Sequence, residues 1–161
     1  SAEGEALAAF TEALTFALRH LARAIAKDGE GATKLITCGV SGAPDEACAR
    51  LVAKSVINSP LVKTAVFGAD ANWGRILCAI GYAQVEFDIS KVSVWFSSAA
   101  GRIQVCEAGS GVPFDEASAK KILLEGEIGI DISLNQGAKS AVAWGCDLTY
   151  DYVKINGDYR T

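Results

Sequence analysis

The chain has 161 residues, a formal net charge of −4 and one histidine; half of its residues are hydrophobic and 21% are charged. This composition is typical of a globular protein with a real core, in one domain or two small ones, and no apolar run reaches the length of a transmembrane helix. Without a basic patch, nucleic acid is excluded as an expected partner, and no membrane partner is expected.

The cysteines and the single histidine limit which metal sites and catalytic triads the chain can form. The five cysteines are scattered without a CxxC pair, which predicts reduced thiols in an intracellular compartment and disfavours a zinc site. The single His20 leaves little room for a Ser-His-Asp triad and none for a multi-histidine metal site, so we expect it at a surface or interface. A phosphate-binding glycine loop of the P-loop or dinucleotide type is also absent from the sequence.

The first elements are a long helix and a glycine turn. Apolar residues at helical spacing predict an amphipathic helix over residues 3–26. Residues 28–34 (DGEGATK) follow, and the glycines on either side of Glu30 indicate positive φ or close backbone approach, which can aim the Glu30 carboxylate away from its own chain. The alternative is a helix C-cap at Gly29 followed by an ordinary solvated loop.

The next elements alternate between predicted strands and helices. Residues 34–40 read as a strand, and a helix opened by Pro44 runs to Asn58. Because Ser59-Pro60 breaks this helix, we predict an apolar strand over residues 61–67.

Residues 68–75 (GADANWGR) then begin a short helix, with Asp70 or Asn72 as its N-cap. Trp73 and Arg75 at its start can bind an anion, or can fill the core and pair with an internal acid.

The second half is richer in strands. Residues 92–97 and 102–107 predict a hairpin, and a helix runs from Pro113 to about Leu124. The strand over residues 128–134 turns at residues 135–137, and residues 138–149 are expected to pair back on it before a final helical turn over residues 150–155. This order predicts an α+β fold, with helices packed on mainly antiparallel sheets.

The remaining polar groups suit a small zwitterion. Glu30 can hold an ammonium group. Side chains that can hold a carboxylate or an amide are Asn72, Arg75, Asn156 and Thr161.

Four stretches read together carry a family resemblance. They are residues 28–34 (DGEGATK), 58–65 (NSPLVKTA), 68–75 (GADANWGR) and 146–161 (CDLTYDYVKINGDYRT). In this order they resemble the C-terminal part of the β chain of the ornithine acetyltransferase (ArgJ) family, and the resemblance covers essentially the whole chain. One departure is Gly157, where the family more often has alanine.

The resemblance implies the C-terminal portion of a self-cleaving fold. Residues 1–60 would complete the layered domain that bears the nucleophile, and residues 61–161 would form a smaller α+β domain whose tail returns to the active site.

The resemblance also implies a reaction. Family members move the acetyl group from N2-acetylornithine to glutamate through an acetyl-threonine intermediate, on a threonine freed by self-cleavage; covalent catalysis splits the transfer into two easier steps. The family register places this threonine upstream of Ser1, so no catalytic residue is expected in this chain. The family's substrate-binding positions match Glu30, Asn156 and Thr161.

The family resemblance also implies partners and a cellular location. The resemblance implies an α chain from the same precursor, αβ dimers that pair as a heterotetramer, no cofactor, and a place in the prokaryotic cytoplasm, the plastid stroma or the mitochondrial matrix. Some members also accept acetyl-CoA, and the resemblance leaves this open here. Two other functions stay open: a related aminopeptidase-like hydrolase that releases acetate, and a non-catalytic assembly fragment.

Overall fold

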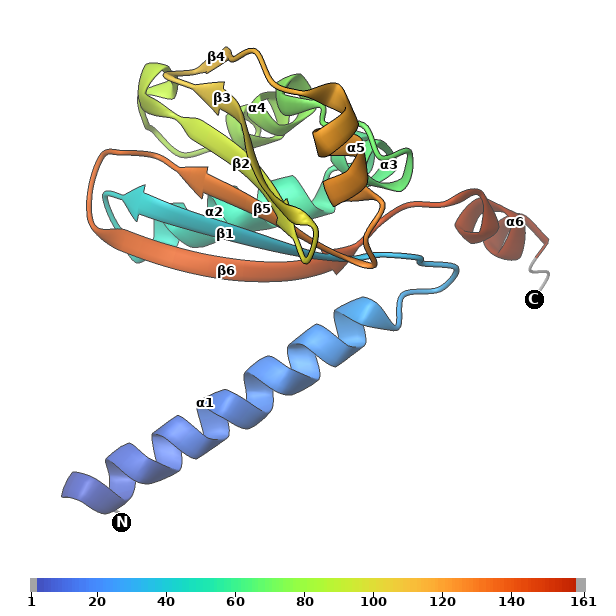
Figure 1. Cartoon of the computed structure of the whole chain (residues 1–161). Helices are drawn as coiled ribbons and strands as arrows, with labels where there is room; N and C mark the ends of the chain where they lie inside the picture. The colour runs from blue at the N-terminus through green and yellow to red at the C-terminus, as the bar shows by residue number, and fades with distance from the viewer. Residues whose placement is uncertain (1–2, 159–161) are drawn as a thin grey trace.

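The computed structural model describes residues 3–158, and in this range one mixed sheet carries helices on one face (Figure 1). The elements are α1 (Gly4–Lys27), β1 (Leu35–Ala43), α2 (Glu46–Asn58), α3 (Pro60–Phe67), α4 (Trp73–Gly81), a short 3-10 helix η1 (Ile89–Lys91), β2 (Ser93–Ser98), β3 (Gly101–Glu107), β4 (Ser110–Gly111), α5 (Glu116–Leu123), β5 (Glu127–Ser133), β6 (Lys139–Cys146) and α6 (Tyr150–Asp158).

The strands follow the order β4-β3-β2-β5-β1-β6. The β1–β5 pair is parallel and the other four pairs are antiparallel, which confirms the predicted α+β class with mainly antiparallel pairing. β1 comes from the first predicted segment, residues 1–60, and its neighbours β5 and β6 come from the second. The division at residue 60 stays a prediction.

The predicted pairing of residues 138–149 with residues 128–134 is wrong. β1 lies between β5 and β6, and β6 pairs with β1 instead. The connecting turn bonds to the end of β1, because Leu134 N donates to Ser41 O and Gln136 N donates to Gly42 O. The chain therefore crosses over the end of β1 rather than closing a hairpin.

The core lies between the sheet and four helices, α2, α3, α4 and α5 (Figure 1). Alternate residues of the two central strands point to this face and are fully buried: Ile36, Cys38 and Val40 in β1, and Ile128, Ile130 and Ile132 in β5. Burial also raises the pKa of the Cys38 thiol far above its ordinary value, so this thiol stays protonated and packs as an apolar group.

Residues 61–67, predicted as a strand, belong to helix α3, so that prediction is wrong. Ser59 caps the helix by accepting a hydrogen bond from Val62 N at 3.4 Å, and Pro60 occupies the first turn, where a missing N–H costs nothing. Val62, Ala65 and Val66 are buried at helical spacing. The proline that ends α2 also begins α3.

Helix α4 agrees with its predicted start. Asn72 is the N-cap and accepts a hydrogen bond from Arg75 N at 3.0 Å. Arg75 Nη1 donates to Leu61 O at 3.0 Å and to Thr64 Oγ1 at 3.2 Å, so it ties α4 to α3. Trp73 packs against the core. Of the two predicted roles for this pair, filling the core fits Trp73, while Arg75 bonds to α3 rather than to an internal acid.

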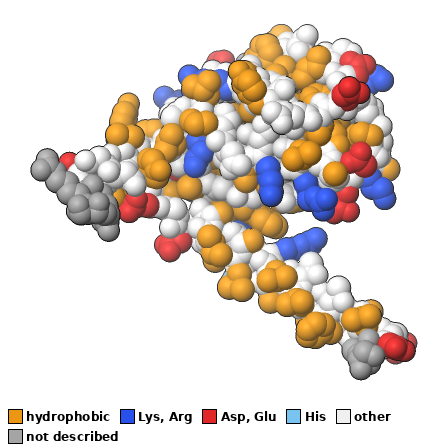
Figure 2. Space-filling view, turned by 180° about the vertical axis from the view of Figure 1, so that it is seen from behind, with side chains coloured by type: hydrophobic (Ala, Val, Ile, Leu, Met, Phe, Trp, Pro, Cys, Tyr) orange, Lys and Arg blue, Asp and Glu red, His pale blue; other side chains and the backbone are white. Residues whose placement is uncertain are grey.

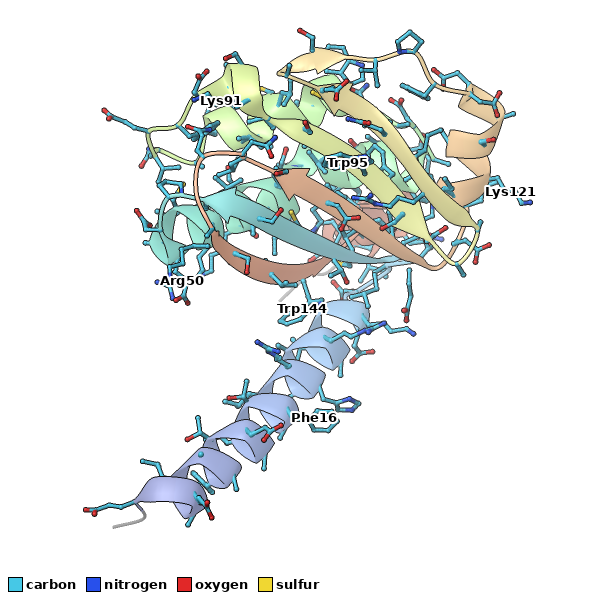
Figure 3. All side chains as sticks on the ribbon, turned by 60° about the vertical axis from the view of Figure 1, so that its left-hand side comes forward. Phe16, Arg50, Lys91, Trp95, Lys121 and Trp144 are labelled. Atoms are coloured by element: carbon cyan, nitrogen blue, oxygen red, sulfur yellow. The ribbon has the colours of Figure 1, made fainter. Side chains whose placement is uncertain are left out.

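Helix α1 projects from the body of the protein (Figure 1) and has no buried residue in its described length. Apolar side chains gather along it in Figure 2, and Figure 3 shows Phe16 on this helix and Trp144 where β6 passes its C-terminal end. The exposed large apolar residues of α1 are Leu7, Phe10, Leu14, Phe16, Leu18, Leu21 and Ile25. Among the helices of residues 3–158, none is long and apolar enough to cross a membrane.

Candidate substrate-binding site

The glycine turn between α1 and β1 packs against the segment between β6 and α6. Gly31 has φ of +67°, and a Cβ at this position would lie 2.8 Å from Tyr152 N. A Cβ at position 29 would lie 2.5 Å from Cys146 Sγ. Gly31 is therefore required where two backbone segments approach closely, as the sequence pattern predicts, while Gly29 leaves room for the Cys146 side chain. Helix α1 ends at Lys27 with Asp28 as its C-cap, one residue before the alternative C-cap at Gly29.

A buried carboxylate joins the two segments. Asp147 is only 3% exposed and follows β6 directly. Its Oδ1 accepts hydrogen bonds from Thr33 N at 2.8 Å and from Lys34 N at 3.0 Å, and its Oδ2 accepts one from Thr33 Oγ1 at 2.5 Å. Three donors on one carboxylate fix both the position and the direction of the turn's last residues.

Lys34 extends this contact into helix α3. Its buried ammonium group donates to Val66 O at 2.7 Å and to Phe67 O at 3.2 Å. A cation at the C-terminal end of a helix is favoured by the helix dipole. Burial lowers the pKa of Lys34 below its ordinary value, and the negative charge of Asp147 partly opposes that change.

Thr149 completes the connection at the start of α6. Its buried hydroxyl donates to Gly31 O at 2.6 Å and accepts from Tyr152 N at 3.2 Å, which is the geometry of a helix N-cap. Tyr150 also packs edge-on against Phe67, with 5.5 Å between ring centroids. We call Thr33, Lys34, Asp147 and Thr149 the polar network; the first three are bonded to one another, and Thr149 joins the same two segments through Gly31 O.

The polar network places two predicted site residues side by side. Asn156 Nδ2 donates to Glu30 Oε2 at 2.7 Å and to Tyr152 O at 2.9 Å. Both Glu30 and Asn156 are exposed. A carboxylate and an amide in contact at the surface offer acceptors and donors to an amino-acid ligand. The third predicted residue, Thr161, lies outside the described residues.

The polar network itself was not predicted from the sequence. One local signal exists, because Thr149 followed by a helical turn is a plausible N-cap. Asp147 carries no such signal: a single aspartate after a strand is usually solvated, and its partners Thr33 and Lys34 lie 114 and 113 residues away. Only the pairing of β1 with β6 brings them together.

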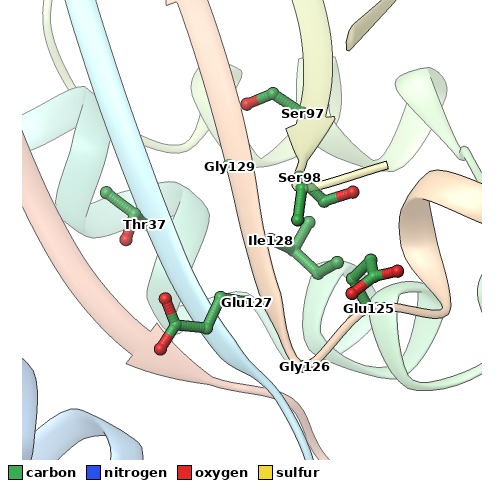
Figure 4. Close-up of a pocket in the computed structure, with 9 residues that line it drawn as sticks. Thr37, Ser97, Ser98, Glu125, Gly126, Glu127, Ile128 and Gly129 are labelled. Atoms are coloured by element: carbon green, nitrogen blue, oxygen red, sulfur yellow. The ribbon is translucent and has the colours of Figure 1, made fainter. Parts of the chain in front are cut away.

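Two hollows lie elsewhere, on the sheet face that the core helices leave open. One of about 510 Å³ surrounds the start of β5 and is lined by Thr37, Ser97, Ser98, Glu125, Glu127 and Gly129, among others (Figure 4). The other, of about 420 Å³, contains Trp95, Arg102 and Asp131. Neither includes Glu30 or Asn156. Since ligand sites are usually concave, Glu30 and Asn156 can form only one wall of a site.

Three charged residues of these hollows, Glu127, Arg102 and Asp131, are paired within the chain. Glu127 bonds to Lys27 Nζ at 3.1 Å and to Arg23, and the hydrogen bond from Lys27 is the main cause of its lowered pKa. In the second hollow Arg102 Nε lies 3.2 Å from Asp131 Oδ2 and stacks over Trp95 at 4.7 Å. These three side chains are therefore less available to an amino-acid ligand than the exposed Glu30–Asn156 pair.

Comparison with known proteins identifies the class first. The chain is 57% identical over 152 residues, or 94% of its length, to the arginine biosynthesis bifunctional protein ArgJ of Caldanaerobacter subterraneus, and it spans 38% of that protein. It is 53% identical over all 161 residues to ArgJ 1 of Clostridium acetobutylicum, of which it spans 40%. The similar proteins are thus enzymes named for arginine biosynthesis.

The fold gives the same result. A crystal structure of the arginine biosynthesis bifunctional protein argJ from Bacillus halodurans matches with a TM-score of 0.91 and 43% identity, over 99% of this chain and 73% of that one. The model of the ArgJ family matches residues 1–161. The chain belongs to the ArgJ family, and it spans about two fifths of the length of the curated relatives named here.

Proposed function

We propose that this chain is the substrate-binding part of a glutamate N-acetyltransferase. In the complete enzyme the acetyl group of N2-acetylornithine passes to a threonine upstream of Ser1 and then to glutamate. The observation that supports the proposal best is the hydrogen bond between Glu30 and Asn156, which are 126 residues apart in the sequence and 2.7 Å apart in the fold. They are two of the three positions at which the family resemblance implies substrate contacts.

The chemistry of the pair fits both substrates. The α-nitrogen is an amide N–H in the acetylated donor and an amine in the acceptor glutamate, so a carboxylate acceptor at Glu30 can bond to either. The ornithine side chain also offers its ammonium group to the same carboxylate. Glutamate has no ammonium group on its side chain, so the two half-reactions can tell these contacts apart.

Thr161 would complete this wall of the site. Helix α6 carries Asn156 and is described to Asp158, three residues before the end of the sequence. We therefore expect a tag after Thr161 to abolish most acetyl transfer in the complete enzyme while self-cleavage stays normal, and an N-terminal tag to leave both unchanged. Unchanged kcat/KM with the C-terminal tag would remove Thr161 from the site.

The rest of the site would come from the remainder of the enzyme. Helix α1 has no buried residue in its described part, and one face of the sheet carries none of the four core helices. Both features support packing against an α chain from the same precursor, with αβ dimers paired as a heterotetramer. The transfer between the two amino acids needs no cofactor; acetyl-CoA would be an additional donor. The relatives named above are bacterial, which supports a cytoplasmic enzyme.

Mass spectrometry of the complete enzyme tests the function. After addition of N2-acetylornithine we expect one acetylated threonine, which glutamate discharges as N-acetylglutamate. Discharge by water at the same rate would favour the aminopeptidase-like hydrolase. No adduct would favour a non-catalytic assembly fragment. The isolated 161-residue chain serves as the negative control: if the acyl-forming threonine lies upstream of Ser1, as proposed, this chain should show no transfer.

A further inference from the structure

Four polar or charged residues are buried in the described part of the chain, and three of them, Lys34, Asp147 and Thr149, belong to the polar network. Desolvating a charge is expensive, so a buried carboxylate and a buried ammonium are kept only where each has several hydrogen bonds. The network meets this condition: Asp147 accepts three hydrogen bonds and the Lys34 ammonium donates two. Three of the four buried polar residues thus lie where the glycine turn meets the segment that follows β6.

This junction joins the two segments that carry the site. On one side, Thr33 and Lys34 follow Glu30 by three and four residues. On the other side, Thr149 caps α6, the helix that carries Asn156. Asp147 holds Thr33 and Lys34 of the first segment, and Thr149 of the second segment bonds to Gly31 O. The distance between Glu30 and Asn156 therefore depends on the polar network more than on their own exposed hydrogen bond.

We propose that Asp147 is a positioning residue for substrate binding: by holding Thr33 and Lys34 it fixes the glycine turn so that the Glu30 carboxylate stands beside Asn156. This inference rests on the proposed function of the Glu30–Asn156 pair. Asp147 does not touch the substrate. Its loss acts through Glu30 and changes affinity for the substrate more than the rate of the chemical step.

Asp147→Asn is the informative variant. The asparagine Oδ1 can still accept from the two backbone N–H groups, while the negative charge and the acceptor for Thr33 Oγ1 are lost. In the complete enzyme we expect KM for both N2-acetylornithine and glutamate to rise about tenfold, with kcat changed less than twofold. Asp147→Glu keeps the negative charge but places the carboxylate on a side chain one methylene longer. Its KM values should therefore lie between those of the parent enzyme and those of Asp147→Asn.

A double-mutant cycle with Glu30→Gln separates positioning from a merely structural role. If Asp147 acts through Glu30, Asp147→Asn should raise KM less than twofold once Glu30→Gln is present, because the contact that it positions is already weakened. Asp45→Asn is the control: Asp45 follows β1, whereas the glycine turn precedes it, and Asp45 caps α2 by accepting from Cys48 N at 2.7 Å. Its effect should be small and equal in both backgrounds.

Three outcomes are decisive. A tenfold rise in KM that is the same in both backgrounds, or a fall in kcat with KM unchanged, would overturn the role of Asp147 and leave the proposed site intact. A Glu30→Gln enzyme with unchanged KM for both substrates would instead remove the site itself. If Asp147→Asn does not fold, Thr33→Val removes one hydrogen bond to Asp147 Oδ2, and the same non-additivity with Glu30→Gln is expected at about threefold.

Discussion

The same two chain segments contain three buried polar residues, Lys34, Asp147 and Thr149, and an exposed pair, Glu30 and Asn156. Asp147 is 3% exposed and accepts three hydrogen bonds, whereas Glu30 is exposed and bonds to Asn156. Removing a partner from a buried ion leaves an uncompensated charge, while exposed pairs contribute little to stability. The comparison teaches that residues four positions apart, such as the exposed Glu30 and the buried Lys34, can have separate roles: Glu30 is free to exchange its partner for a ligand, and Lys34 must keep its partners.

The largest effect on stability is expected from Asp147→Ala. The change leaves the N–H groups of Thr33 and Lys34 and the Thr33 hydroxyl without their acceptor, and it removes the negative charge that partly offsets burial of Lys34. We expect a loss of about 3–5 kcal/mol, the scale for breaking a buried charged contact. Thermal unfolding of the complete enzyme should show a Tm lower by on the order of 10 °C.

Asp45→Ala is the control for this prediction. Asp45 also accepts a backbone N–H, but it is an exposed helix cap, and its removal should cost about 1 kcal/mol. Equal losses for the two variants would mean that burial does not distinguish Asp147 from an ordinary capping carboxylate.

Gly31→Ala should have the next largest effect. At φ of +67° an alanine is strained, and its Cβ would lie 2.8 Å from Tyr152 N in a segment that the polar network holds in place. We expect a loss of about 1–3 kcal/mol, measured as a drop in Tm. Gly157→Ala is the control, because an added Cβ at this position has no atom within 4 Å. This variant should not lower Tm. A tolerated Gly31→Ala would show that the turn adapts.

A smaller effect on stability is expected from protonation of Glu127, which bonds to Lys27 and Arg23 where α1 meets the sheet. The hydrogen bond from Lys27 and the charge of Arg23 hold the pKa of Glu127 below its ordinary value of 4.5. Because the folded pKa is the lower one, the contribution of Glu127 to stability is present above pH 4.5 and is lost as the pH falls through the folded pKa. NMR of the Arg23 side-chain nitrogen should show a transition with a midpoint below pH 4.5 that Glu127→Gln abolishes. A transition at or above 4.5 would contradict this contact.

Much of the fold is encoded locally and could be predicted. The helical spacing of α1, the alternation in β2, β3 and β5, and the cap at Asn72 all depend on residues a few positions apart. The failures share a cause. The apolar run 61–67 fits a strand or a helix by periodicity, and Ser59-Pro60 can end one helix and also begin the next. The position of β1 between β5 and β6 depends on pairings about 90 to 110 residues apart.

In the candidate site, too, one residue is indicated by its local sequence and another is not. Glu30 was marked by its flanking glycines, and the structure shows what both glycines approach. Asn156 was placed by family resemblance, because nothing local in the sequence predicts its contact with Glu30. The exposed apolar stripe of α1 shows a further limit: its pattern predicts a helix with a buried face, but it does not say which surface covers that face.

The smallest effect on stability, and the most direct test of the central claim, is expected for Glu30→Gln in the complete enzyme. The variant should keep the Tm of the parent, because Glu30 is exposed, and should lose about 1–3 kcal/mol of kcat/KM, the scale of a charge-assisted hydrogen bond. Acetylation of the threonine by N2-acetylornithine and its discharge by glutamate should be measured separately. Equal losses in both would place Glu30 at the shared α-nitrogen, and a loss confined to acetylation would place it at the ornithine side chain. A lower Tm with both rates intact would contradict the account, because Glu30 would then be structural.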